Sequence, residues 1–182
     1  MGEDKSGIDP FGSGPLLETP LRALVAAGAQ PVAVVGRLGS APAGAISLPD
    51  RYPGEGPLGG IITALHWSPH DLVVVVACDM PFLTAESVAE LVSAAWRDPS
   101  RAGVFAELDG RVQPLTAVWR RSLALDVLAE EFSAGQRAPR RLLDRLPVET
   151  IRCSDHESLV DLDSPADIHR YAPLARRRAR GD

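Results

Sequence analysis

The chain is poor in cysteine, and this scarcity limits the chemistry that it can support. Its 182 residues include two cysteines, Cys78 and Cys153, which lie far apart and form no Cys-x-x-Cys pair. The four histidines add no metal-ligand spacing to them, so we expect neither a structural zinc site nor a disulfide framework. This cysteine usage fits a reduced, cytoplasmic compartment.

Long apolar runs and a strong net charge are also missing. No stretch approaches the roughly 18 apolar residues of a membrane span, and the first residues lack the apolar core of a signal peptide. The net charge of −5 gives no general electrostatic reason to bind nucleic acid, and the scattered tryptophans have no basic companions. We therefore expect no nucleic-acid partner and no membrane insertion.

What remains is the composition of one globular domain. The chain is 45% hydrophobic and 24% charged, which is enough for one sizeable core. We assign residues 1–171 to a single domain and residues 172–182 to a basic C-terminal tail. Four arginines lie in that tail, and we expect it to be a solvated, frayed terminus.

The most informative stretch is an apolar run over residues 72–77, followed by Cys78-Asp79-Met80-Pro81. An unbroken apolar run that stops at an acid and a proline predicts a strand buried on both faces. Ligands of open α/β sheets bind outside the carboxyl ends of the strands, which would place Asp79 at the mouth of a cleft. The alternative is a strand-ending turn in which Asp79 only binds the backbone. On this motif alone, the two interpretations are equally good.

A glycine-rich turn precedes that strand. It runs from Asp50 through Gly54 to Gly56-Pro57-Leu58 and leads into an apolar segment. Proline fits the first turn of a helix, and glycines let a ligand approach the backbone closely. The start of this helix is therefore a candidate anion or nucleotide site. An ordinary flexible loop is the alternative, because the turn matches neither of the common phosphate-binding glycine patterns.

Hydrophobic periodicity predicts an α/β fold with a mixed, mostly parallel sheet. Asp109-Gly110 indicates a hairpin, and Pro114 puts its second strand at a sheet edge or beside a bulge. We expect helices at residues 16–28, from 57, 84–96, 123–132, 137–146 and 166–171, and strands at residues 32–35, 45–48, 72–78, 104–108, 112–119 and 148–153.

Four motifs in this order resemble those of the molybdenum cofactor guanylyltransferases, within the wider family of Rossmann-like nucleotidyltransferases. The resemblance covers nearly the whole chain and implies the three-layer fold of that family. The motifs are Met1-Gly2-Glu3-Asp4-Lys5, the segment from Asp50 to Gly60, Cys78-Asp79-Met80-Pro81, and Asp161-Leu162-Asp163-Ser164-Pro165.

The resemblance implies transfer of GMP from GTP to a phosphate of molybdopterin, with Mg²⁺ and release of pyrophosphate. By position in the motifs, Lys5 is expected to contact GTP and Asp79 to bind the metal. Asp50 and the Gly56-Pro57-Leu58 turn are expected to bind guanosine. A cation and a metal suit this chemistry, because an anionic phosphate must approach an anionic triphosphate. Molybdoenzymes, or other proteins of cofactor biosynthesis, are possible transient partners.

Two departures from the family pattern change these expectations. The closing motif of the family usually reads Asn-x-Asn-Thr-Pro, whereas this chain has Asp161, Asp163 and Ser164 at those positions. An ionised aspartate only accepts hydrogen bonds, so Asp163 becomes a possible second metal ligand. The alternative is that both aspartates merely cap the closing helix.

The second departure is at the start of the chain. Family members begin with a strand and Leu-Ala-Gly-Gly before Met-Gly-x-Asp-Lys, whereas this sequence begins at that methionine. We expect that the sequence is truncated at its N-terminus and lacks the usual first strand. Residues 73–76 would then lose a neighbouring strand, at about 1–3 kcal/mol for each unsatisfied backbone group. The activity of this truncated form is accordingly expected to be reduced or lost.

Three other functions share the same motifs. A molybdopterin cytidylyltransferase or a phospholactate guanylyltransferase would use the same lysine, glycine turn and Asp79, because base choice depends on a few contacts. A non-catalytic nucleotide-binding protein is the alternative outside enzymes, and the altered closing motif and the absent glycine loop favour it.

Overall fold

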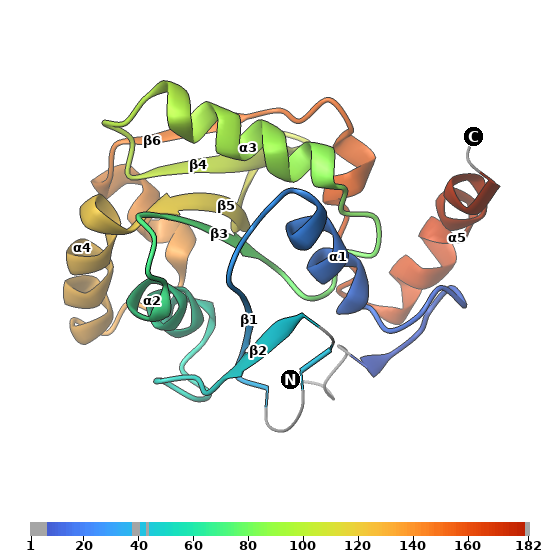
Figure 1. Ribbon diagram of the computed structural model, residues 1–182, viewed down its shortest axis with the longest axis horizontal. Coiled ribbons are helices and arrows are strands. Elements are labelled where there is room, and N and C mark those ends of the chain that lie inside the picture. The colour runs from blue at the N-terminus through green and yellow to red at the C-terminus, as the bar shows by residue number, and fades with distance from the viewer. Residues whose placement is uncertain (1–6, 38–40, 43, 181–182) are drawn as a thin grey trace.

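The computed structural model describes residues 7–37, 41–42 and 44–180, which fold into an α/β architecture (Figure 1). The helices are α1 (Glu18–Ala26), α2 (Pro57–Trp67), α3 (Ala85–Arg97), α4 (Arg121–Ser133) and α5 (Pro165–Arg180), with the 3₁₀ helices η2 (Pro139–Arg145) and η3 (His156–Leu159). The strands are β1 (Val32–Val35), β2 (Ala45–Leu48), β3 (Leu72–Val76), β4 (Gly103–Leu108), β5 (Arg111–Arg120) and β6 (Val148–Ile151). No helix in the described ranges is long and apolar enough to cross a bilayer.

The strands form two separate sheets. A four-stranded sheet has the order β3-β5-β4-β6, and β1 pairs with β2 in a parallel two-stranded sheet. In the larger sheet β5 is antiparallel to both β3 and β4, whereas β6 is parallel to β4. Three of its strands therefore run in one direction and β5 runs against them, which confirms the predicted mixed sheet.

Helices cover both faces of the larger sheet (Figure 1). Val104 and Val118 point to one face and pack with residues of α1 and α3. The alternate residues Phe105 and Trp119 point to the other face and pack with α2 and α4, their rings meeting edge to face at 4.8 Å between centroids. This period-two alternation gives the three layers expected from the sequence.

The hairpin forms as predicted, with Asp109 and Gly110 both at positive φ in the turn. Pro114 lies in a bulge, because Phe105 pairs with Ala117 while Ala106 pairs with Gln113. Proline has no N–H to donate to a ladder, and the bulge removes that demand. The edge alternative for this strand was wrong, since β5 lies between β3 and β4.

β3 differs from the buried strand that its sequence predicts. All five of its residues are half-buried, because β3 ends the larger sheet and pairs with β5 alone among the described strands. The apolar run correctly indicated a strand, but it did not show that one of its edges lacks a partner. Cys78 is exposed just beyond this strand.

The C-terminal residues also differ from expectation. The predicted helix at residues 166–171 extends as α5 to Arg180, so most of the expected frayed tail is helical. Leu174 is buried against Phe82 and Val160, and Arg178 donates two hydrogen bonds of 2.7 Å to Asp155. Alanine and arginine favour a helix, and apolar burial and ion pairing stabilise α5 although Pro173 lies inside it. The predicted helix at residues 137–146 is the shorter 3₁₀ helix η2.

Candidate functional site

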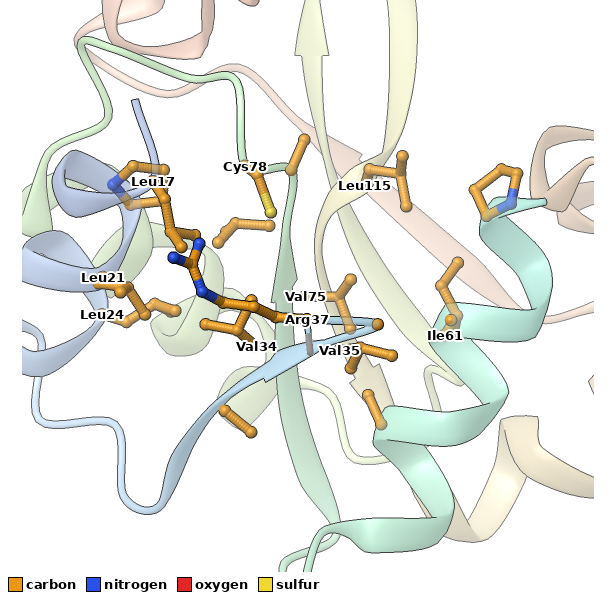
Figure 2. A pocket seen from close by; sticks show the side chains of 18 of the residues that line it. Leu17, Leu21, Leu24, Val34, Val35, Arg37, Ile61, Val75, Cys78 and Leu115 are labelled. Carbon is orange, nitrogen blue, oxygen red and sulfur yellow. The ribbon is translucent and has the colours of Figure 1, made fainter. Parts of the chain in front are cut away.

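A pocket of about 530 Å³ lies between β1 and β3 (Figure 2). Leu21 and Leu24 of α1 line one side, and Ile61 of α2 lines the other. Burying a phosphate against such apolar walls would be costly, because a charge loses its hydration without gaining partners. Polar groups gather instead where β1 and β3 end, at the lining residues Gly36, Arg37, Cys78 and Asp79.

Two predicted site segments meet at this pocket. Asp79 follows β3, and Pro57 begins α2, and both residues line the pocket. The carboxyl ends of β1 and β3 lie together here, which is the edge where ligands of α/β sheets bind. The structure therefore brings the glycine turn and the strand-end acid to one place, as their order in the sequence led us to expect.

The closing motif is also part of this site. The backbone N–H of Leu162 donates a 3.0 Å hydrogen bond to the carbonyl oxygen of Asp79. Leu162 itself is buried, so the flanking Asp161 and Asp163 are held beside the end of β3. This contact joins residues that the sequence alone could associate only through the family resemblance.

Ser164 and Asp167 cap the start of α5. The Asp167 carboxylate accepts hydrogen bonds of 2.8 Å from both the backbone N–H and the hydroxyl of Ser164. These hydrogen bonds hold the pKa of Asp167 below its ordinary value. The cap role is thus filled by Ser164 and Asp167, with Asp161 and Asp163 located before the helix begins.

Negative charge accumulates around Asp161. Removal from water, followed by the charges of Asp163 and Asp79, raises the pKa of Asp161 above its ordinary value of 3.8. The residue still reaches solvent, which limits the size of this effect. A bound cation would favour the ionised form of these carboxyl groups and so stabilise the site.

The residues suit a metal that is shared with a ligand better than a metal held by protein alone. Within the described ranges, no group of three or more His, Cys, Asp or Glu side chains could hold a metal ion. Mg²⁺ keeps several waters and is commonly bound by one or two carboxylates together with substrate phosphates. Asp79 and Asp163 could supply those two carboxylates.

The glycine turn has a shape that depends on Gly56. This residue has φ of 86°, in the left-handed region, and the Arg137 carbonyl oxygen lies 3.7 Å from where a Cβ would be. Pro57 has no N–H, so the first donor of α2 is the Leu58 backbone N–H. The Leu58 side chain is fully buried in the core under α4, which leaves only its backbone for a nucleotide.

Asp50 lies beside the end of β1 and faces α2. Its Oδ1 accepts hydrogen bonds from the Thr63 hydroxyl at 2.9 Å and from the Tyr52 backbone N–H at 3.0 Å. Its Cβ is 3.9 Å from where a Cβ of Gly36 would lie, and Gly36 lines the pocket. Asp50 is therefore held next to the pocket by residues on both sides of the glycine turn.

Sequence reasoning missed how the outside of this turn is fastened. Arg137 donates a 2.6 Å hydrogen bond to Glu55, 82 positions away, and its guanidinium lies 4.0 Å from the Phe132 ring centroid. Phe132 in turn contacts Tyr52, with 4.5 Å between ring centroids. A separation of this length leaves no local signal in the sequence.

One basic residue was predicted for this site, and a different one is found at the pocket. Lys5, predicted to contact GTP, lies outside the described residues. Arg37 lines the pocket (Figure 2). Asp79 lines the same pocket, and the sequence motifs gave no role to Arg37. A basic residue two positions after a short strand was the signal that could have identified it.

The sequence of the chain matches that of a known protein family. Residues 1–151 match the MobA-like NTP transferase domain. The chain belongs to this family. A molybdenum cofactor guanylyltransferase from Rhizobium johnstonii is 32% identical over 181 residues, covering 92% of the chain and 83% of the relative. A probable molybdenum cofactor guanylyltransferase from Bacillus licheniformis is 28% identical over 129 residues, and the alignment covers 69% of the chain but only 65% of that relative.

Solved structures agree on the fold of this MobA-like domain. Molybdopterin-guanine dinucleotide biosynthesis protein A from Archaeoglobus fulgidus aligns with a TM-score of 0.72 and 23% identity, covering 97% of the chain and 92% of that protein. A 2-C-methyl-D-erythritol 4-phosphate cytidylyltransferase from Thermus thermophilus aligns with the same TM-score of 0.72 and 22% identity, covering 94% of each chain. At these identities, the two alignments support the nucleotidyltransferase fold.

Two adjacent glycines of α2 test how closely the turn packs. An alanine Cβ at position 59 would lie 2.9 Å from the Tyr52 Cβ, whereas one at position 60 would meet nothing within 4 Å. We expect Gly59→Ala to lower the free energy of unfolding by about 1–2 kcal/mol through overpacking. Gly60→Ala is the matched control and should raise it by about 0.5–1 kcal/mol, because alanine favours the helix. Urea unfolding measures both, and equal shifts would contradict this packing.

The crowded charges make a prediction about pH. Because the folded pKa of Asp161 is raised, its contribution to stability is present below pH 3.8 and is lost as pH rises through the folded pKa. We expect Asp161→Asn to be more stable than the parent at pH 7 without metal, with the gain fading towards pH 3.8.

Asp167→Asn is the control, and its effect on stability should have the opposite sign. The pKa of Asp167 is lowered in the folded state, so its carboxylate stabilises the fold above pH 3.8. It should be less stable than the parent at pH 7. Thermal melting across this pH range measures both variants. A destabilising effect of Asp161→Asn at pH 7 would show that its carboxylate is not crowded.

Proposed function

We propose that this MobA-like protein transfers GMP from GTP to the terminal phosphate of molybdopterin, with release of pyrophosphate. The name of the Rhizobium relative, a molybdenum cofactor guanylyltransferase, supports this substrate pair. The observation that carries the proposal is geometric: the start of α2 and Asp79 line one pocket, and the Asp79 carbonyl accepts the Leu162 N–H. The proposed nucleoside site and the proposed metal site would thus adjoin each other.

Guanosine is proposed to bind along Asp50 and the Gly56-Pro57-Leu58 turn. Asp50 presents a carboxylate that accepts N–H or O–H donors, and its orientation is fixed by Thr63 and Tyr52. Gly56 lets the nucleotide approach the backbone, since no side chain projects there. The partial positive charge at the start of α2 favours the adjacent phosphates.

Asp79, with Asp163 beside it, is proposed to hold Mg²⁺ together with the triphosphate. When bound, the metal would neutralise phosphate charge that otherwise repels the incoming anion. Lys5 is proposed to be the cation that contacts the GTP phosphates. The carboxylates would act on the triphosphate through the bound metal, and the apolar walls of the pocket would keep its charged groups at the strand ends.

The reaction needs no nucleophile from the protein. An oxygen of the molybdopterin phosphate forms a bond to the α-phosphorus of GTP, and the bond from that phosphorus to the α,β-bridging oxygen breaks. Pyrophosphate leaves with the bonding electrons. The contribution of the chain is positioning and charge stabilisation, which supply most of the catalysis in phosphoryl and nucleotidyl transfer.

The proposed reaction suggests where the protein acts and which proteins it meets. We propose a cytoplasmic enzyme that meets molybdoenzymes or other cofactor-biosynthesis proteins transiently when its product is handed on. The low cysteine content of the sequence, with Cys78 and Cys153 both free, supports that compartment.

The metal role is tested by Asp79→Asn, which keeps the side-chain shape and removes the charge. We expect Mg²⁺ to strengthen GTP binding to the parent and to have little effect on the variant. Pyrophosphate release from GTP and molybdopterin should fall about 100-fold or more, which corresponds to roughly 3 kcal/mol of transition-state stabilisation. Calorimetry and a pyrophosphate assay measure the two effects.

Asp126→Asn makes the same chemical change at an exposed position of α4 and is the matched control. It should leave both measurements unchanged. If Asp79→Asn still responds to Mg²⁺ as the parent does, the proposed metal site is wrong.

A further inference from the structure

Thr63 is a polar side chain in the apolar core beside the site. It lies in the middle of α2, only 1% exposed, among residues whose side chains pack under α4. Its hydroxyl oxygen lies 2.9 Å from Asp50 Oδ1, 2.9 Å from the Gly59 carbonyl oxygen and 3.1 Å from the Arg51 backbone nitrogen. A buried hydroxyl with this many partners connects the helix to the segment that precedes the glycine turn.

The hydrogen of this hydroxyl can serve one acceptor at a time. The Gly59 carbonyl lies four residues earlier in the same helix, where the helical ladder already gives it the Thr63 backbone N–H. Asp50 is the charged acceptor, and charge-assisted hydrogen bonds are the stronger ones. The hydroxyl therefore donates to Asp50 and accepts from the Arg51 N–H, which sets its direction.

This arrangement occupies one oxygen of Asp50 and leaves the other for a ligand. Both hydrogen bonds that Asp50 accepts from the described residues, from Thr63 and from Tyr52, end on Oδ1. A carboxylate fixed through one oxygen presents the second in a defined direction. Without the Thr63 hydroxyl, the Tyr52 N–H alone would hold it, and the carboxylate could turn.

We propose that Thr63 is a positioning residue for the nucleoside half of the site. It holds Asp50 so that Oδ2 accepts a hydrogen bond from an N–H or O–H donor of guanosine. This inference rests on the proposed function, because it assumes that Asp50 faces the nucleoside. It adds a residue that touches no substrate and acts through Asp50.

Two substitutions separate this role from packing. Thr63→Val keeps the shape and removes the hydroxyl, whereas Thr63→Ser keeps the hydroxyl and removes a buried methyl group. We expect Thr63→Val to raise the Kd for GTP about tenfold, the loss of one hydrogen bond to a charged group, and Thr63→Ser to bind GTP within about twofold of the parent. Both should melt at lower temperature than the parent, so stability alone would not produce the difference in binding.

Combining Thr63→Val with Asp50→Asn gives a double-mutant cycle. In the Asp50→Asn background the oriented carboxylate is already gone, so adding Thr63→Val should change the Kd less than about twofold. Calorimetric titration of the intact chain with GTP and Mg²⁺ gives all four values. A full tenfold loss in that background would mean that Thr63 acts independently of Asp50, and the inference would be overturned.

Nucleotide analogues identify the donor. ITP lacks the exocyclic amine of guanine, and 2′-deoxyGTP lacks a ribose hydroxyl. If Asp50 accepts a hydrogen bond from one of these groups, Thr63→Val should weaken binding of the analogue that lacks this group less than it weakens binding of GTP. Equal losses of affinity for both analogues would support a different donor of the nucleoside.

Failure of this inference is distinguishable from failure of the proposed function. If Asp50→Asn weakens GTP binding but Thr63→Val binds like the parent, only the positioning role is wrong. If Asp50→Asn itself has no effect, the proposed place of guanosine is wrong. Retained binding in Thr63→Val together with impaired binding in Thr63→Ser would show a packing role.

Discussion

The hydrogen bond from the Leu162 N–H to the Asp79 carbonyl is the contact on which the arrangement of the site depends. It is 3.0 Å long and ties the end of β3 to the segment that leads into α5. The burial of Leu162 protects this bond from water, and a buried backbone pair is costly to break. Asp79, Asp161 and Asp163 are brought together as a consequence, at the price of mutual repulsion that raises the pKa of Asp161.

A second constraint acts on the other half of the site. The segment from Asp50 to Gly56, proposed to bind the nucleoside, has no regular secondary structure that would hold it. Thr63 fastens it from the core side, and the Glu55 and Arg137 ion pair fastens it from the surface side. Gly59 permits the close approach of Tyr52 that both contacts require. Rigid positioning of this kind is what nucleotidyl transfer demands of a protein.

Much of the fold was predictable because its signals are local. The Asp109-Gly110 hairpin and the Pro57 helix start each depend on neighbouring residues, and each is found in the structure. The length of α5 and the place of β3 at one end of the larger sheet were missed, since they depend on contacts with Phe82 and on which of the described strands pair with one another. An apolar run indicates a strand, but its sequence does not reveal how many neighbours that strand has.

The sequence predicted several residues of the candidate site, but not the contacts that hold them in place. The order of the motifs pointed to Asp50, the glycine turn and Asp79. In the structure Pro57 and Asp79 line one pocket, and Asp50 lies beside the pocket residue Gly36. The partners that orient them, Thr63 and Arg137, are a mid-helix threonine and a surface arginine, residue types that occur throughout proteins without such roles. Their contribution depends on distances that only the folded chain defines.

Hydrogen exchange of the backbone amides, with and without GTP and Mg²⁺, tests the central claim most directly. Exchange reports local opening, so a bound nucleotide should slow it in the segments that the ligand holds. Slower exchange at residues 50–63, 77–82 and 161–163, with no change at residues 121–131 of α4, is the predicted result. Protection elsewhere without protection in these three segments would contradict the placement of the nucleotide across the turn and the end of β3.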